Sequence, residues 1–123
     1  MPQFVKYEHI PAFKADTSRF THPLVFNISD CIPAYTFDDI TYDKGASLLR
    51  MLESWMGGHD QACGPFCRGI QDYLSVGSSV KSVDDLWSAL EGARHDQNRG
   101  YSIAEIMQGW IRQPHTPCKS IYN

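Results

Sequence analysis

Four stretches of the chain repeat their hydrophobic residues at intervals of three or four positions, with polar residues between them. Residues at these intervals lie on one face of an α-helix. The clearest stretch runs from Ile40 or Thr41 to Met56, and glycines 57 and 58 end it. Its apolar stripe consists of Leu48, Leu49, Leu52, Trp55 and Met56. The pattern predicts a long helix whose stripe is covered by a neighbouring helix.

Capping signals mark three further predicted helices. One starts near Pro65 and ends at Gly77, the next has Ser82 as its N-cap, and the last starts with Ser102 and Glu105 as a capping box. Their apolar stripes are Phe66, Ile70, Tyr73 and Leu74, then Val83, Leu86, Trp87 and Leu90, then Ile103, Ile106, Met107, Trp110 and Ile111. We therefore expect an all-α helical bundle.

The remaining segments are less regular. Residues 4–15 form either one kinked helix or a short helix with an irregular tail, because Pro11 interrupts them. Residues 16–36 are predicted to be a long loop, with a brief extended piece at 24–28. Residues 92–101 are polar and are predicted to connect the last two helices.

Size and charge limit the possible functions. A chain of 123 residues is one domain at most. The net charge of −3, with scattered lysines and arginines, argues against nucleic acid as a partner. No apolar run reaches the roughly 20 residues of a membrane span, and the N-terminus lacks the pattern of a signal peptide. On that basis the expected location is cytoplasmic.

The chain has four cysteines, Cys31, Cys63, Cys67 and Cys118. Without a secretory signal, free thiols are the expected state, and a disulfide between Cys63 and Cys67 is the alternative. His59, Cys63 and Cys67 are also spaced like zinc ligands on one helix face. Gly64-Pro65 lies between the cysteines and should break such a helix, which disfavours that zinc site.

Tyr42 is the candidate for chemistry, because it stands at the start of the strongest predicted helix. A phenol there can donate a directed hydrogen bond to an oxyanion without carrying charge. The alternative from chemistry alone is a partly buried tyrosine whose hydroxyl contacts water.

Residues 37–53, FDDITYDKGASLLRMLE, resemble the Tyr-x-Lys-Gly-Ala segment of the zinc aminopeptidases of the membrane alanyl aminopeptidase type, the gluzincin aminopeptidases. Other segments resemble this family in the same order. They are Thr21 to Leu24, the set Phe66, Gly69, Tyr73 and Leu74, Asp84 to Trp87, and the run Ile106, Met107, Trp110 and Gln113. The resemblance covers residues 4–117.

This resemblance implies a fold and two site residues. The fold would be the C-terminal subdomain of a thermolysin-like catalytic domain, with residues 1–123 as a single partial domain, the C-terminal half of a peptidase catalytic domain. Tyr42 would stabilise the tetrahedral intermediate, and Phe37 would lie near the pocket for the substrate's N-terminal side chain. Lys44 and Gly45 would be structural, with the lysine either solvated or paired with an acid.

The zinc-binding motif His-Glu-x-x-His is absent, since no two of the five histidines are four residues apart. In the family the motif precedes the segment that this chain matches. We therefore expect no metal or cofactor within this chain, and zinc only in the full-length family. The resemblance implies a partial aminopeptidase that is inactive alone, with a peptide as substrate and the missing zinc-bearing half as possible partner.

Two other interpretations remain. The chain could be a non-catalytic helical interaction module derived from the family, or an unrelated small helical bundle. Compartment also stays open, because the family includes cytosolic, membrane-anchored and secreted members.

Overall fold

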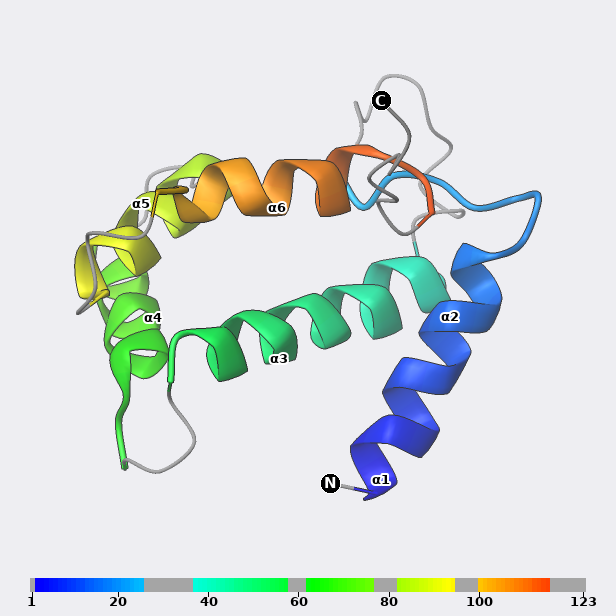
Figure 1. Cartoon of the computed structure of the whole chain (residues 1–123), viewed down its shortest axis with the longest axis horizontal. Helices are drawn as coiled ribbons and strands as arrows, with labels where there is room; N and C mark the ends of the chain where they lie inside the picture. The colour runs from blue at the N-terminus through cyan, green and yellow to red at the C-terminus, as the bar shows by residue number, and fades with distance from the viewer. Residues whose placement is uncertain (1, 26–36, 58–61, 77–81, 95–99, 116–123) are drawn as a thin grey trace. The chain divides into compact units, whose positions relative to one another are not determined.

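The computed structural model describes residues 2–25, 37–57, 62–76, 82–94 and 100–115, and every regular element within these ranges is helical (Figure 1). The elements are α1 (Pro2–Phe4), η1 (Val5–His9), α2 (Ile10–Asp16), η4 (Ile40–Lys44), α3 (Gly45–Trp55), α4 (Pro65–Ser75), α5 (Val83–Ala93) and α6 (Ile103–Arg112). The all-α prediction is confirmed. Within these ranges, no helix is long and apolar enough to cross a membrane.

The N-terminal segment is one continuous helix in which α1, η1 and α2 follow without a break. The π-helical turn η1 directly precedes α2, and its capping residue Ile10 donates its N–H to the carbonyl of Val5. Pro11 lacks an N–H, and its ring would clash with the carbonyl four residues earlier. A wider π-helical turn there relieves this conflict. The prediction of one helix through Pro11 is therefore the correct alternative.

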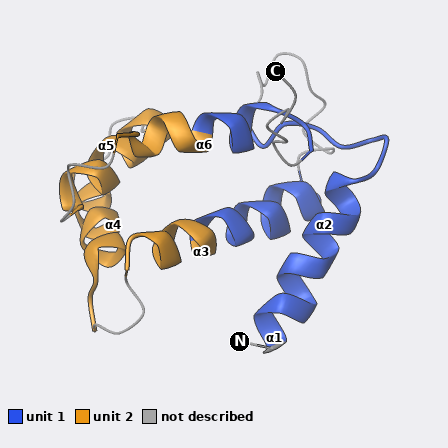
Figure 2. Ribbon diagram, viewed as in Figure 1, with its two compact units in different colours: residues 1–49, 108–123 blue, residues 50–107 orange. Residues whose placement is uncertain are grey.

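The chain divides into two compact units, which are described separately (Figure 2). Unit 1 comprises residues 1–49 and 108–123, and its buried hydrophobic residues are Ala12, Ile40, Leu48 and Ile111. Unit 2 comprises residues 50–107, and its buried hydrophobic residues are Leu52, Trp87, Leu90, Ile103 and Met107. Most of these residues belong to the predicted stripes. Leu49 and Leu74 were predicted in the same stripes and are exposed.

Both predicted N-terminal caps of unit 2 are present. At the start of α5, Ser82 Oγ accepts the N–H of Asp85 at 3.2 Å, and the Asp85 carboxylate accepts the N–H of Ser82 at 2.7 Å. Ser102 and Glu105 exchange the same pair of bonds at the start of α6. Each capping box satisfies two backbone N–H groups that the helix itself cannot pair.

Helices α4 and α5 approach closely at Gly69. A Cβ at this position would lie 2.8 Å from Leu90 Cδ2 and 2.9 Å from Leu90 Cα. Leu90 is fully buried, so neither atom has free space to move into. Leu74 lies five positions further along α4, in its last turn, and at 67% exposure it falls outside this contact.

Replacing Gly69 by alanine is expected to lower the free energy of unfolding by about 1–3 kcal/mol, because the methyl group overpacks the contact with Leu90. Urea denaturation followed by circular dichroism measures this. Gly92→Ala in α5 is the matched control, since nothing lies within 4 Å of a Cβ there. That variant should be unchanged or stabilised by up to about 1 kcal/mol. Equal behaviour of the two variants would contradict the close approach.

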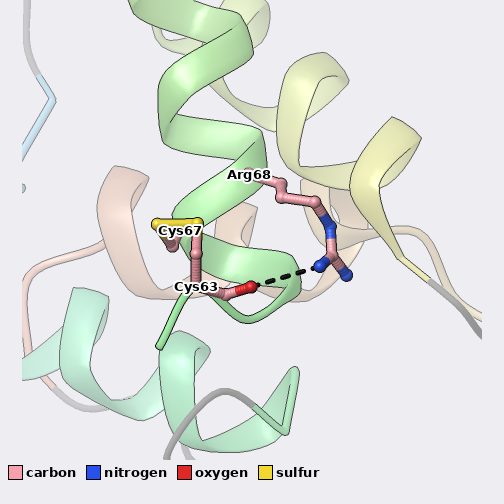
Figure 3. The surroundings of a disulfide bond; sticks show 3 residues. All are labelled: Cys63, Cys67 and Arg68. Atoms are coloured by element: carbon pink, nitrogen blue, oxygen red, sulfur yellow. Dashed lines mark hydrogen bonds between the residues drawn. A yellow bond between two sulfur atoms is a disulfide. The ribbon is translucent and has the colours of Figure 1, made fainter. Parts of the chain in front are cut away.

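A disulfide joins Cys63 to Cys67 across the start of α4 (Figure 3). Their Cα atoms lie 5.2 Å apart, within the ordinary range for a bridged pair. The carbonyl of Cys63 also accepts a hydrogen bond from Arg68 Nη1 at 3.2 Å. The expectation of free thiols is therefore wrong for these two cysteines, and the alternative of a Cys63–Cys67 disulfide is correct. Because both sulfurs are bonded, the zinc site that the sequence disfavoured is excluded as well. Cys31, Cys118 and His59 lie outside the described residues.

The double variant Cys63→Ser, Cys67→Ser is expected to lower the free energy of unfolding by about 2 kcal/mol, the chain-entropy value for so short a loop. Urea denaturation of the oxidised wild type and the variant measures the difference. Dithiothreitol should lower the free energy of unfolding of the wild type by the same amount and leave that of the variant unchanged. A wild type indifferent to reduction would argue against this stabilisation.

Candidate active site around Tyr42

Tyr42 lies in the π-helical turn η4, directly before α3. The turn is buried on one side through Ile40 and Lys44, whereas the Tyr42 side chain is 58% exposed. At the start of the turn, Asp38 Oδ1 accepts the N–H of Thr41 at 2.9 Å, and the Asp38 carbonyl accepts the N–H of Tyr42 at 3.1 Å. Turns of this kind occur often at functional sites. The phenol therefore faces the outside of unit 1 on a turn that is anchored at its start.

Phe37 lies beside Tyr42. The ring centroids are 6.4 Å apart and the ring planes are inclined by 30°, within the range of aromatic contacts. The Phe37 side chain is 73% exposed. The two residues singled out from the sequence are thus neighbours in space, and together they form an open aromatic surface with one hydroxyl group.

His22 contacts the same segment from the preceding loop. Its Nε2 lies 2.8 Å from Asp38 Oδ2, and its Nδ1 lies 2.7 Å from the carbonyl oxygen of Pro23. His22 thus connects the loop after α2 to the Asp38 carboxylate, and Asp38 lies between Phe37 and Tyr42 in the sequence.

The pKa of Asp38 is lowered from 3.8. Partial burial is the largest single influence and raises this pKa, but it is outweighed by the backbone N–H of Thr41 together with the hydrogen bond and positive charge of His22. Sequence reasoning singled out neither His22 nor Asp38. The match of residues 21–24 to a family loop was the available signal.

Asp38→Asn is expected to lower the free energy of unfolding at pH 7 by at most about 1 kcal/mol, because the carboxylate is partly exposed and screened. The folded pKa is the lower one, so this contribution is present above pH 3.8 and is lost as the pH falls through the folded value. Urea denaturation over a pH series measures this. Asp72→Asn is the control, because Asp72 is exposed. It should change the free energy of unfolding by no more than about 0.5 kcal/mol. A difference between Asp38→Asn and wild type that does not shrink as the pH falls below 3.8 would contradict the assignment.

A buried ion pair lies at the other end of η4. Lys44 Nζ is 2.9 Å from Asp16 Oδ1, and the two side chains are 6% and 7% exposed. The same carboxylate oxygen accepts Thr21 Oγ1 at 3.1 Å and the N–H of His115 at 3.1 Å. Lys44 Nζ also donates to the carbonyl of His115 at 3.4 Å. Of the two alternatives for Lys44, solvated or paired with an acid, the second is correct.

His115 has a φ of 65°, which few residues other than glycine adopt. The contacts with Asp16 and Lys44 hold both of its backbone polar groups, and they give a physical reason for this conformation. The segment after α6, the loop after α2 and the end of η4 therefore meet at one buried carboxylate.

The pKa of Asp43 is raised from 3.8. Burial is the largest cause, followed by the negative charge and hydrogen bonding of Glu8 and by the charge of Asp39. Glu8 belongs to η1, so the two π-helical turns η1 and η4 face each other through a pair of carboxyl groups. One proton shared between them would remove the repulsion next to Tyr42.

The residues that the structure describes contain no group of three or more His, Cys, Asp or Glu side chains placed to hold a metal ion. In the sequence, no pair of histidines has the spacing of the zinc motif. The described residues therefore do not fit a catalytic zinc site of their own.

Comparisons with known proteins agree with the resemblance seen in the sequence. The family model described as the peptidase family M1 domain matches residues 1–110. Tricorn protease-interacting factor F2 of Thermoplasma volcanium is 35% identical over 118 residues, covering 93% of this chain and 14% of that protein. Probable aminopeptidase 1 of Saccharolobus solfataricus is 36% identical over 112 residues, 89% of this chain and 13% of that protein.

Aminopeptidase A of Gloydius brevicauda is 37% identical over 111 residues, which cover 88% of this chain and 10% of that protein. The chain thus spans about one seventh or less of the length of these relatives. The family implies zinc and peptide hydrolysis for its full-length members. Since the family model covers most of its length, the chain belongs to peptidase family M1.

Proposed function

We propose that this chain is the tyrosine-bearing, C-terminal half of the catalytic domain of an M1 aminopeptidase, which removes N-terminal residues from peptides. The observation that carries the proposal is the exposure of the Tyr42 phenol on the anchored turn η4, with the Phe37 ring 6.4 Å away. A hydrogen-bond donor beside an aromatic surface supports a substrate with an apolar first side chain.

Each residue has a role in this proposal. The Tyr42 hydroxyl donates a hydrogen bond to the oxyanion that forms when the scissile carbonyl becomes tetrahedral. A positioned neutral donor is worth about 10²- to 10³-fold in rate, because it stabilises charge that develops only in the transition state. Phe37 forms part of the wall of the pocket for the substrate's first side chain.

The chain alone is expected to be inactive, because its sequence lacks the ligands of the family's zinc and the glutamate base between them. The test uses a chimera in which this chain replaces the matched segment of probable aminopeptidase 1 of Saccharolobus solfataricus. The chimera should release the chromogenic amine from alanyl or leucyl anilides, and the isolated chain should not. Hydrolysis by the isolated chain, or an inactive but folded chimera, would refute the proposal.

The non-catalytic interaction module remains the second candidate, favoured by an apolar stripe on the N-terminal helix. Tyr7, Ile10 and Phe13 follow one another at three-residue intervals and are 61%, 46% and 59% exposed. Exposed apolar stripes often mark contacts with another polypeptide. The two candidates differ in the chimera, since an interaction module would fold there without restoring hydrolysis.

A further inference from the structure

We propose that Asp16 and Lys44 are positioning residues for the Tyr42 phenol, which they hold through the π-helical turn η4. This inference rests on the proposed function, since it assigns how the catalytic hydroxyl would be kept in place. They act on the phenol through the backbone, because Lys44 is the last residue of η4 and stands two positions after Tyr42.

The turn η4 is held at both of its ends. At its start, the carbonyl and carboxylate of Asp38 accept the N–H groups of Tyr42 and Thr41. At its end, the Lys44 ammonium is bound to Asp16 in a buried position. Tyr42 lies between these two attachments and is itself exposed. A side chain with so few contacts of its own takes its direction from the backbone that carries it.

The buried pair also selects the π-helical geometry. A π-helical turn is rarer than an α-helical one and needs surrounding contacts to persist. Relaxation of η4 to α-helical geometry would turn Tyr42 relative to Lys44, because each residue of an α-helix is rotated by about 100° from the last. The Lys44 ammonium opposes this change, since it would have to leave the Asp16 carboxylate inside unit 1.

The hydrogen bonds of this pair are directional, and this distinguishes it from ordinary core packing. Asp16 Oδ1 accepts donors from Lys44, Thr21 and His115, which belong to separate segments of the chain. Hydrogen bonds to a charged group have a defined length and angle. Apolar side chains of similar volume would fill the same space without fixing the register of the turn.

The test replaces the pair by apolar residues in Asp16→Leu, Lys44→Met, which leaves no unpaired buried charge. The second variant, Asp16→Asn, keeps an oxygen acceptor for Lys44, Thr21 and His115 and removes only the negative charge, and it serves if the double variant does not fold. The matched control is Arg50→Met, Glu53→Leu, which removes an ion pair of 2.6 Å from the adjoining helix α3. All variants are made in the full chain and in the chimera.

In the full chain, nuclear Overhauser contacts between the Phe37 and Tyr42 rings report the direction of the phenol. They should be strong in the wild type and in the control, and should weaken at least threefold in either Asp16 variant whose unfolding remains cooperative. In the chimera, kcat should fall about 10²-fold at nearly constant KM, the size expected for a misplacement of about 1 Å. The control should keep kcat within twofold.

Unchanged ring contacts in a folded Asp16 variant would overturn the inference, and so would an unchanged kcat in an active chimera. Failure of the proposed function is a distinct result. In that case the wild-type chimera does not hydrolyse the anilides, while the ring contacts of the full chain still decide whether Asp16 and Lys44 position Tyr42. Addition of Tyr42→Phe to the Asp16 variants should lower kcat little further, because the displaced phenol has already lost its role.

Discussion

Replacing Tyr42 by phenylalanine is expected to lower kcat of the chimera by about 10²- to 10³-fold and to change KM by less than about threefold. The substitution removes one oxygen atom from a side chain that is 58% exposed, so the core of unit 1 is not disturbed. The hydroxyl is expected to bind the oxyanion and not the ground-state carbonyl, and the loss should therefore appear in kcat. Initial rates with leucyl anilide over a range of concentrations measure both constants.

Tyr101→Phe is the matched control, since Tyr101 is another exposed tyrosine, at 66%, and belongs to unit 2. Its removal should leave kcat within about twofold. Circular dichroism and the urea midpoint should be the same for both variants and the wild type, because neither hydroxyl is buried. A Tyr42→Phe chimera that retains its full kcat would show that Tyr42 is not the transition-state donor.

Replacing Lys44 by methionine should destabilise the full chain by about 3–5 kcal/mol, because it leaves the Asp16 carboxylate buried without its cation. Both side chains are less than one tenth exposed, so water cannot take the place of the ammonium. Urea denaturation measures the loss, and a variant already unfolded without denaturant corresponds to the upper end of the range. The double variant Asp16→Leu, Lys44→Met should recover part of this stability, because it removes the unpaired charge but also removes the acceptor of Thr21 and His115.

Arg50→Met is the matched control, since the side chains of the Arg50–Glu53 pair are 33% and 29% exposed. Its loss should cost no more than about 1 kcal/mol. The comparison of the two variants separates the effect of burial on stability from the effect of losing any ion pair. If Lys44→Met is no more destabilising than Arg50→Met, the Lys44 ammonium is hydrated in solution and the pair is not a buried anchor.

The helices could be predicted because their signals are local. The stripe that contains Leu48 and Leu52, and the capping boxes at Ser82 and Ser102, depend on residues within four positions of one another. Leu74 was assigned wrongly because periodicity does not show where along a helix its neighbour ends. Neither π-helical turn was predicted. The cause of η1 is local, the conflict at Pro11, but a proline pattern indicates an interruption and not the kind of turn that results. The turn η4 ends at Lys44, whose partner Asp16 lies 28 positions away in the sequence.

In the candidate site, too, the residues with local signals could be predicted and those that meet only in the folded chain could not. Tyr42 and Phe37 are five positions apart at the start of one helix, so a local motif could single them out together. Asp16 and His115 could not be found in this way, because they are 99 positions apart and meet only in the folded unit. The Cys63–Cys67 bond was disfavoured by an argument from cellular compartment, which carries no information about the geometry at the start of α4.

Unit 1 is discontinuous, which has a consequence for synthesis on the ribosome. Its first part, residues 1–49, has to wait for residues 108–123, whereas unit 2 is made from one uninterrupted stretch. At ordinary elongation rates the intervening stretch takes roughly 3–12 s to translate. During that interval the nascent Asp16 and Lys44 lack the His115 backbone, so the hydrogen bonds around this ion pair can be completed only after unit 2 has been synthesised.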